Sequence, residues 1–320
     1  MREGDGKTKK APLRKEAGIA MVLVVWALAI LAVVVGEVVF SSRLKARADL
    51  HLLHEVQSYG LALAAYHAAL DALGEDLKGL SLGEGGELLL HRGPDDPEET
   101  AEVQDVPLGE GTYSYTVADE DARIDVNRQT RQVLVALLRK AGMQLGAERD
   151  GLIDSILDWR DPNREHHLAG AEEDYYRSLD EPYSCKDGPM DVKEELLLVK
   201  GMLPEYFYGG TVDEKPFAPL SDWITVYPAA FNPATAREEV LEILGQVRPP
   251  AGAPPRLSRF YTIVASGRAA VDGPERRIKA VVRRDGRGSQ ISFHLLYWND
   301  NFYPYRAENA TNEIQPGDTP

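Results

Sequence analysis

The sequence predicts an α+β protein in which a long N-terminal helix accompanies an antiparallel sheet, and an inserted all-α domain interrupts that sheet. An uncharged apolar run near the N-terminus continues into an amphipathic stripe, which is typical of one long helix. Strand-like alternation occurs before residue 123 and returns after residue 257, with helical periodicity between them. We therefore expect the sheet domain at residues 41–122 and 257–298, and the insertion at residues 123–250.

The apolar run is Gly18–Phe40, and Ile19–Val35 within it carries no charge. A helix over residues 19–40 would be about 33 Å long, enough to cross the hydrocarbon core of a bilayer. The flank before it, Met1–Glu16, carries six basic and three acidic side chains. The positive-inside rule then predicts a single-pass membrane protein with a cytoplasmic N-terminus and an exported C-terminal domain.

Three interpretations of this segment compete. A cleaved secretory signal is disfavoured, because Val33–Glu37 makes a poor small-residue cleavage site. A plain membrane anchor and a type IV pilin-like leader both remain open. The second is suggested by Arg14–Ile19, a basic patch that ends in glycine directly before the apolar run. This patch resembles a prepilin peptidase site, with residues 1–18 as leader, Gly18 as its last residue and Ile19 as the first mature residue.

Charge and cysteine content limit the possible functions. The chain of 320 residues has a formal net charge of −15, and the residues after Glu16 carry −18 because the first sixteen are net basic. Such a surface repels nucleic acid and anionic lipid, and it favours divalent cations or basic partners. Cys185 is the single cysteine, so an intramolecular disulfide is impossible and an inert thiol is expected.

Past the apolar run the helix is predicted to continue as an amphipathic stripe up to the glycines at 74 and 79. A helix that lies half in lipid and half against a domain is the ground plan of pilins. A simple stalk is the alternative, but strands are predicted soon afterwards at Glu87–His91 and Thr112–Ala118. The stripe consists of Leu44, Ala48, Leu52, Val56, Tyr59, Leu63, Tyr66, Leu70, Leu73 and Leu77.

After the proline-rich linker Arg248–Arg256, alternation predicts strands again. The three strands are expected at Phe260–Gly267, Arg277–Arg284 and Ser289–Trp298. Residues 299–320 contain few apolar side chains, so we expect a flexible tail there.

Several motifs follow one another inside the insertion. They are DSILDW at 154–159, DPN at 161–163, GAEEDYY at 170–176 and ELLLVKGM at 195–202, and they are preceded by VADE at 117–120 and Asn127. In this order they resemble the K-type minor pseudopilin of bacterial type II secretion systems. The resemblance implies a type IV pilin-like fold, a place at the tip of the pseudopilus, and a role without catalysis. It implies as partners the I-type and J-type minor pseudopilins, prepilin peptidase, and the secretin or secreted cargo.

Three positions bear on this resemblance. Phe231–Thr235 keeps one of the asparagines of the family's N-x-N-T-A string, Asn232. Ile19 stands where pilin-like proteins more often have phenylalanine or methionine. Leu23 replaces the glutamate that most pilin-like subunits carry five residues after the cut, and K-type pseudopilins typically lack it too. A subunit at the tip has no neighbour above it whose amine such a glutamate would neutralise.

An acidic loop in the insertion is the candidate ion site. Hard oxygens on a short irregular stretch suit Ca²⁺ better than zinc, although a solvated acidic loop is the alternative. The spacing is not that of an EF-hand. Members of the resembled family bind calcium in this domain, so we expect calcium on Asp158, Asp161, Asn163, Glu172 and Glu173.

The sequence shows no motif for catalysis. The pairs His51/His54 and His166/His167 lack a zinc-protease frame, and no G-x-S-x-G, Walker or dinucleotide loop occurs. A second class of function is an exported DNA receptor, because Glu194–Gly201 resembles half of a helix-hairpin-helix element. Acidic residues beside this turn argue against phosphate binding, so no nucleic acid partner is expected.

Overall fold

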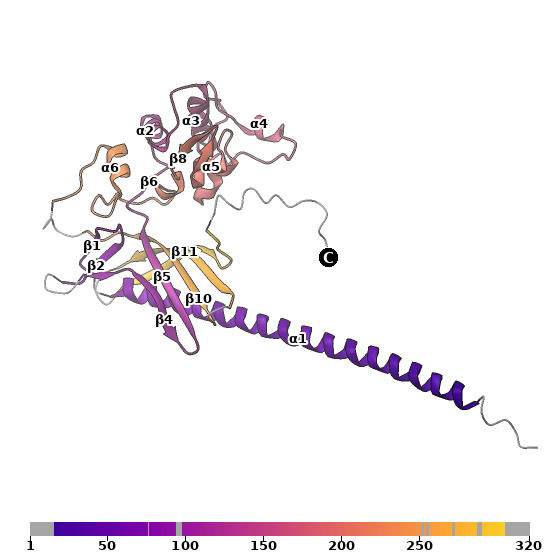
Figure 1. Ribbon diagram of the computed structural model, residues 1–320. Coiled ribbons are helices and arrows are strands. Elements are labelled where there is room, and N and C mark those ends of the chain that lie inside the picture. Colours follow the sequence, from indigo (N-terminus) through magenta and orange to yellow (C-terminus); the bar gives the residue numbers. More distant parts are fainter. Residues whose placement is uncertain are drawn as a thin grey trace, which may run out of the picture. The chain divides into compact units, whose positions relative to one another are not determined.

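The computed structural model describes residues 16–75, 77–93, 98–250, 253, 256–270, 273–286 and 290–304 (Figure 1). The predicted leader up to residue 15 and the predicted tail from residue 305 lie outside the described residues. The chain divides into two compact units, Met1–Val56 and Gln57–Pro320.

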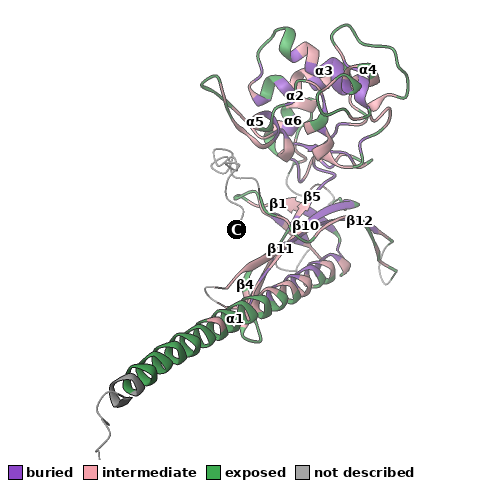
Figure 2. Cartoon of the chain, turned by 90° about the vertical axis from the view of Figure 1, so that its right-hand side faces the viewer, coloured by how far each residue is buried: buried purple, intermediate pink, exposed green. Residues whose placement is uncertain are grey.

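Helix α1 runs from Glu16 to Gly74 without interruption. Its sequence contains no proline, so nothing in it removes a helical hydrogen bond. The part from Met21 onward includes an 18-residue window with a mean hydropathy of 2.8, none of which is buried. Figure 2 shows α1 exposed over its N-terminal part and partly buried toward its C-terminal end. The helix fits a single-pass membrane anchor, as the apolar run predicts.

A five-stranded antiparallel sheet has the strand order β12-β11-β10-β5-β4. At its centre Ile263 pairs with Ala280 on one side and with Val117 on the other. The strands predicted from alternation are confirmed to within about three residues. The bounds are β4 Glu102–Leu108, β5 Gly111–Asp119, β10 Phe260–Arg268, β11 Glu275–Asp285 and β12 Ser292–Asn299.

A smaller sheet, β1-β2-β3, continues from the edge of the five-stranded sheet. The two sheets are joined at Ala101, whose N–H donates to the Leu88 carbonyl and whose carbonyl accepts from the Val117 N–H. The bounds are β1 Gly79–Leu82, β2 Leu88–His91 and β3 Glu99–Thr100.

The last third of α1 packs closely on the five-stranded sheet. Small residues face the sheet, and Ala62, Ala65 and Ala69 are fully buried. A Cβ on Gly267 would overlap the Ser58 carbonyl and the Ala62 nitrogen, so only glycine permits this approach. Ser58 Oγ donates to the Pro274 carbonyl at 2.7 Å and accepts from the Ala269 N–H at 2.9 Å. These bonds fix the helix in register with the sheet.

The insertion between β5 and β10 is mainly helical, and it has a core of its own around the fully buried Tyr176, Phe207, Leu134 and Ile153. It also holds a parallel pair, β6 with β9, and a hairpin, β7 with β8, which the sequence did not predict. The helical bounds are α2 Arg131–Ala141, α3 Ala147–Arg160, α4 Glu173–Arg177, η1 Lys193–Leu198, α5 Pro204–Tyr208, η2 Leu220–Asp222 and α6 Glu238–Leu244. The strands are β6 Ile124–Asp125, β7 Gly210–Val212, β8 Lys215–Phe217 and β9 Ile224–Thr225.

Buried carboxylates tie the insertion to the sheet where the chain passes between them. Asp119 accepts hydrogen bonds from Ser258 Oγ at 2.6 Å and from Thr235 Oγ1 at 2.5 Å. Asp121 accepts the backbone N–H groups of Arg259 at 3.0 Å and Phe260 at 3.1 Å. These bonds link the segment that follows β5 to the segment that leads into β10. We call the buried hydrogen bonds of Asp119 and Asp121 the joint between the sheet and the insertion.

Candidate metal centre

Helix α3 carries the DSILDW motif, and two of its aspartates lie on one buried face because they are four residues apart. Asp154 accepts the Ala169 N–H at 3.0 Å and pairs with Arg131. Asp158 accepts the His167 N–H at 3.1 Å and also contacts His167 Nδ1. The two carboxylates therefore hold the acidic loop against α3 from within.

Gly170 makes room for the second oxygen of Asp158. A Cβ at this position would overlap Asp158 Oδ2. Only glycine fits at this position of the GAEEDYY motif, because any side chain would collide with the Asp158 carboxylate.

Four buried carboxylate oxygens at this place have no hydrogen-bond partner among the described residues. They belong to three side chains from separate segments: Asp158 Oδ2 on α3, Glu172 Oε1 and Oε2 just before α4, and Asp187 Oδ1 beyond it. Asp158 is fully buried and Glu172 is 2 % exposed. Burying anionic oxygens without donors is costly, and a cation at this place would lower that cost.

The electrostatics agree with this geometry. Burial, together with the nearby charges of Asp158, Asp161 and Asp187, raises the pKa of Glu172 to about 7. A carboxyl group held in this way is stabilised in its charged form by a divalent ion at the same place.

The acidic ligand atoms form two groups. One oxygen each of Asp158 and Asp161 and a ring nitrogen of His167 lie within 4.8 Å of one another. One oxygen each of Glu172 and Asp187 and the Cys185 sulfur do so as well. Asp187 was missed by the sequence analysis, because it lies well beyond the acidic loop in the chain.

Two of the five predicted ligands are engaged elsewhere. Glu173 accepts hydrogen bonds from Arg177 Nε at 2.8 Å and from the Cys185 N–H at 2.7 Å, and these bonds lower its pKa. Asn163 is exposed, and its side-chain oxygen accepts the Glu165 N–H at 2.7 Å. Of the predicted ligands, Asp158 and Asp161 lie in one group and Glu172 in the other, while Asn163 and Glu173 lie in neither.

The side chains present fit a hard divalent cation. The free donors are carboxylate oxygens from three segments, which is the ligand set that Ca²⁺ prefers. The side chains that offer carboxylate oxygens to such an ion are Asp158 and Asp161 in one group and Glu172 and Asp187 in the other.

Aromatic side chains lie beneath the cluster, as expected of core residues. The rings of Trp159 and Tyr176 meet edge to face at 5.0 Å, and Tyr175 contacts Tyr176 in the same way at 5.2 Å. Cys185 is buried beside them, and burial raises the pKa of its thiol to about 12. An inert thiol, as the sequence predicts, follows from this protonated state.

Gly18 and Ile19, the predicted prepilin peptidase site, lie in the first turn of α1. Their side chains lie outside the described residues.

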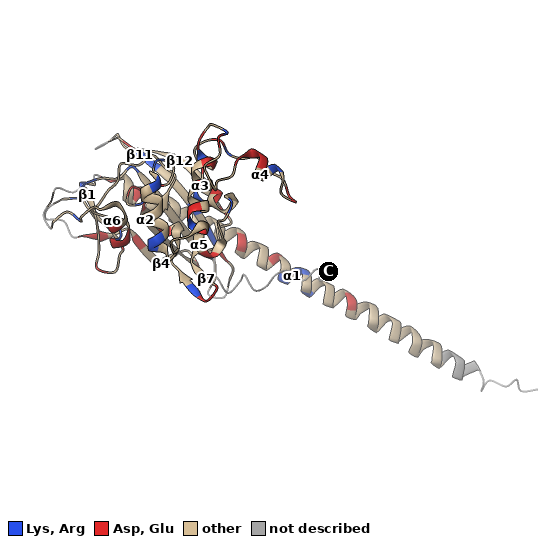
Figure 3. Ribbon diagram, turned by 90° about the horizontal axis from the view of Figure 1, so that it is seen from above, with Lys and Arg blue, Asp and Glu red and all other residues tan. Residues whose placement is uncertain are grey.

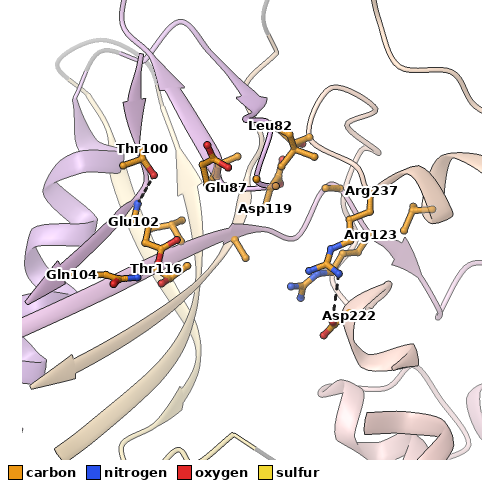
Figure 4. Close-up of a pocket in the computed structure, with 18 residues that line it drawn as sticks. Leu82, Glu87, Thr100, Glu102, Gln104, Thr116, Asp119, Arg123, Asp222 and Arg237 are labelled. Carbon is orange, nitrogen blue, oxygen red and sulfur yellow. Dashed lines mark hydrogen bonds and ion pairs between the residues drawn. The ribbon is translucent and has the colours of Figure 1, made fainter. Parts of the chain in front are cut away.

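A separate cleft of about 710 Å³ lies between the sheets and the insertion (Figure 4). Glu87, Thr100 and Glu102 face it from the strands, and Arg237 faces it from the insertion, where it pairs with Asp222 at 3.5 Å. Its lining includes no histidine, cysteine or lysine.

The turn that suggested DNA binding is occupied by internal contacts. Lys200 Nζ donates to the Gly170 carbonyl at 3.1 Å and lies over the Tyr175 ring. Glu194 forms an ion pair with Lys279 at 3.0 Å. Lys200 therefore binds backbone carbonyls of the acidic loop within the insertion.

Two comparisons find similar proteins. Residues 115–209 match the family model described as type II secretion system (T2SS), protein K. The chain is also similar to one in the crystal structure of the GspK-GspI-GspJ complex from the type 2 secretion system of enterotoxigenic Escherichia coli. That match has a TM-score of 0.54 and 16% identity, and it covers 82% of this chain and 99% of the other. No curated protein matches.

The structural match covers 82% of this chain, so it confirms the predicted fold class. The family match lies over the motifs that begin in β5 and end after α5. The two matches support the resemblance to a K-type minor pseudopilin of type II secretion that the motifs predict.

Proposed function

We propose that this protein is a minor pseudopilin at the tip of the type II secretion pseudopilus, where it helps to initiate assembly and the export of folded proteins. The family match over residues 115–209 carries this proposal. The absence of glutamate at Leu23 supports a place at the tip, since no subunit above needs its amine neutralised. The role is structural, and the protein is not proposed to be an enzyme.

The proposed partners are the I-type and J-type minor pseudopilins. The solved structure that shares this fold is a complex of K, I and J proteins. Contacts with the secretin or with secreted cargo are further proposals. Acidic residues of the insertion, such as those of α4 drawn red in Figure 3, would favour basic partners.

The proposed placement is in the bacterial inner membrane, with the N-terminus in the cytoplasm and the rest in the periplasm. It rests on the basic flank before α1 and on the apolar length of that helix. Prepilin peptidase is proposed to cut between Gly18 and Ile19 and to leave the helix in the membrane.

Calcium is proposed to stabilise the insertion through the carboxylates of Asp158, Asp161, Glu172 and Asp187. The unpartnered buried oxygens support this proposal. The cation would neutralise charges that otherwise repel one another.

Co-expression with the I-type and J-type pseudopilins of the same secretion system tests the function. All three proteins should copurify through an affinity tag on one of them, and should give one mass in native mass spectrometry. As a control, a major pseudopilin should not replace the I-type protein. A chain that purifies alone under these conditions would count against the proposal.

A further inference from the structure

Two arginines of α1 stand one turn apart just after the apolar span. Arg43 and Arg47 are four residues apart, so they lie on the same side of the helix, and both are exposed. Among the described residues, no carboxylate forms an ion pair with either of them. Lys45 lies on the opposite side, one turn before Asp49. In Figure 3 the blue basic segment of α1 lies beyond a long, mostly tan part of the helix.

Their distance from the span matches the headgroup layer of a bilayer. With a rise of 1.5 Å per residue, Arg43 lies about 5 Å and Arg47 about 10 Å beyond Phe40. The polar layer on each side of the hydrocarbon core is about 5–8 Å thick. Long arginine side chains can lean back toward this layer, so both guanidinium groups reach it.

The arginine pair is arranged to bind an anion. Like charges at this spacing destabilise a helix slightly, and an anion between them reverses the effect. A guanidinium group binds phosphate through two parallel hydrogen bonds, which gives geometric specificity as well as energy. Two of them on one side of a helix make a clamp for a phosphate that carries a net negative charge.

We propose that Arg43 and Arg47 bind the headgroup phosphate of an anionic phospholipid and thereby fix the depth of α1 in the membrane. This inference rests on the proposed membrane anchoring. The chain after Glu16 carries a net charge of −18, so broad adhesion to an anionic surface is disfavoured and the contact is local. Zwitterionic lipids present an ammonium group beside the phosphate, which the arginines repel.

Native mass spectrometry of the full chain in detergent tests this proposal. Phosphatidylglycerol and phosphatidylcholine with the same acyl chains would be titrated in parallel. The wild-type chain should retain phosphatidylglycerol at about tenfold lower lipid concentration, and Arg43→Gln with Arg47→Gln should abolish the difference. Lys45→Gln is the matched control, because it removes a charge from the opposite side of the same helix. It should keep the preference.

Equal retention of both lipids by the wild-type chain would overturn the proposal, and so would an equal loss in the Lys45→Gln control. Carbonate extraction of membranes separates this failure from failure of the anchor. If the chain stays in the membrane but shows no lipid preference, the proposed anchor stands and the proposed lipid contact of Arg43 and Arg47 fails. A chain that carbonate extracts refutes both.

Discussion

Asp119, Glu120 and Asp121 are three consecutive buried acids at the joint between sheet and insertion, each at most 6% exposed. Burial and the charge of Asp119 raise the pKa of Asp121 to about 7, although it accepts two backbone N–H groups. Its unfolded value is near 3.8. The folded state therefore binds the proton more tightly, and Asp121 should lower stability as pH rises from about 4 to about 7.

Asp121→Asn should reduce this pH dependence, because the amide does not ionise. The wild-type chain should lose up to about 4 kcal/mol between these limits through this group. Urea denaturation at pH 5 and pH 8 measures the difference, and the variant should lose less than the wild type. Asp180→Asn, at an exposed position, is the control and should keep the wild-type slope. An unchanged slope in Asp121→Asn would contradict the account.

The contact between α1 and β10 makes a second prediction at the residue scale. In Gly267→Ala the added methyl group would overlap backbone atoms of Ser58 and Ala62, which cannot move without breaking the helix. We expect a loss of about 1–3 kcal/mol. Gly60→Ala is the control on the facing helix, where nothing lies within 4 Å, and it should stabilise slightly. Thermal melting of both variants checks the prediction, which fails if Gly267→Ala melts like the wild type.

The candidate ligands show how far residues could be predicted from the sequence. Composition located the acidic loop, but Glu172 and Glu173 are neighbours in the chain and their side chains diverge at the start of α4. Glu172 is buried in the cluster, while Glu173 accepts hydrogen bonds from the Cys185 N–H and from Arg177 Nε. Asp187 enters the cluster through tertiary folding of a loop with φ of 48°, which no local pattern reveals.

At the scale of elements, α1 and the central strands could be predicted because the apolar residues of each recur with one dominant spacing along the chain. Strand β4 was missed, since Glu102–Leu108 is polar, contains Pro107 and is mostly exposed at the sheet edge. The pair β6 and β9 was missed because two-residue strands carry no alternation, and their pairing depends on folding of the whole insertion.

The start of α1 carries the processing prediction. Gly18→Val should block cleavage before Ile19, because a larger side chain would crowd the cleft of the peptidase. The insertion and sheet should still fold, since the change lies far along the chain from both. Intact-mass measurement of the membrane form decides this, and Gly36→Val is a control that leaves the cleavage sequence intact. An uncut terminus in the wild-type chain would favour the plain anchor.

The acidic loop carries the metal prediction. Calcium at a hundredfold excess over its dissociation constant should stabilise the folded chain by about 2.7 kcal/mol, so EDTA should lower the melting temperature. Asp161→Ala with Glu172→Ala should remove the effect, and magnesium should replace calcium poorly because it demands a tighter octahedral shell. Glu173→Gln, outside the cluster, should retain the response. Equal melting in EDTA and in millimolar calcium would refute the site.

At the scale of the whole molecule, each part has one physical task in the proposed function. The apolar part of α1 suits a bilayer, and its last third belongs to the core of the sheet domain. The insertion has a separate core, which the buried joint at Asp119–Asp121 connects to the sheet. In the proposed function, the insertion could bind other proteins without a change in the structure of the anchor or of the sheet domain.

The most direct test of the proposed function is export by the host's type II secretion system after deletion of this gene. Secreted substrates should accumulate in the periplasm, and the wild-type chain, expressed from a plasmid at its normal level, should restore their export. The Gly18→Val chain should not restore it, because an uncleaved subunit cannot enter the pseudopilus. Unchanged export in the deletion strain, with the rest of the system intact, would contradict the central claim.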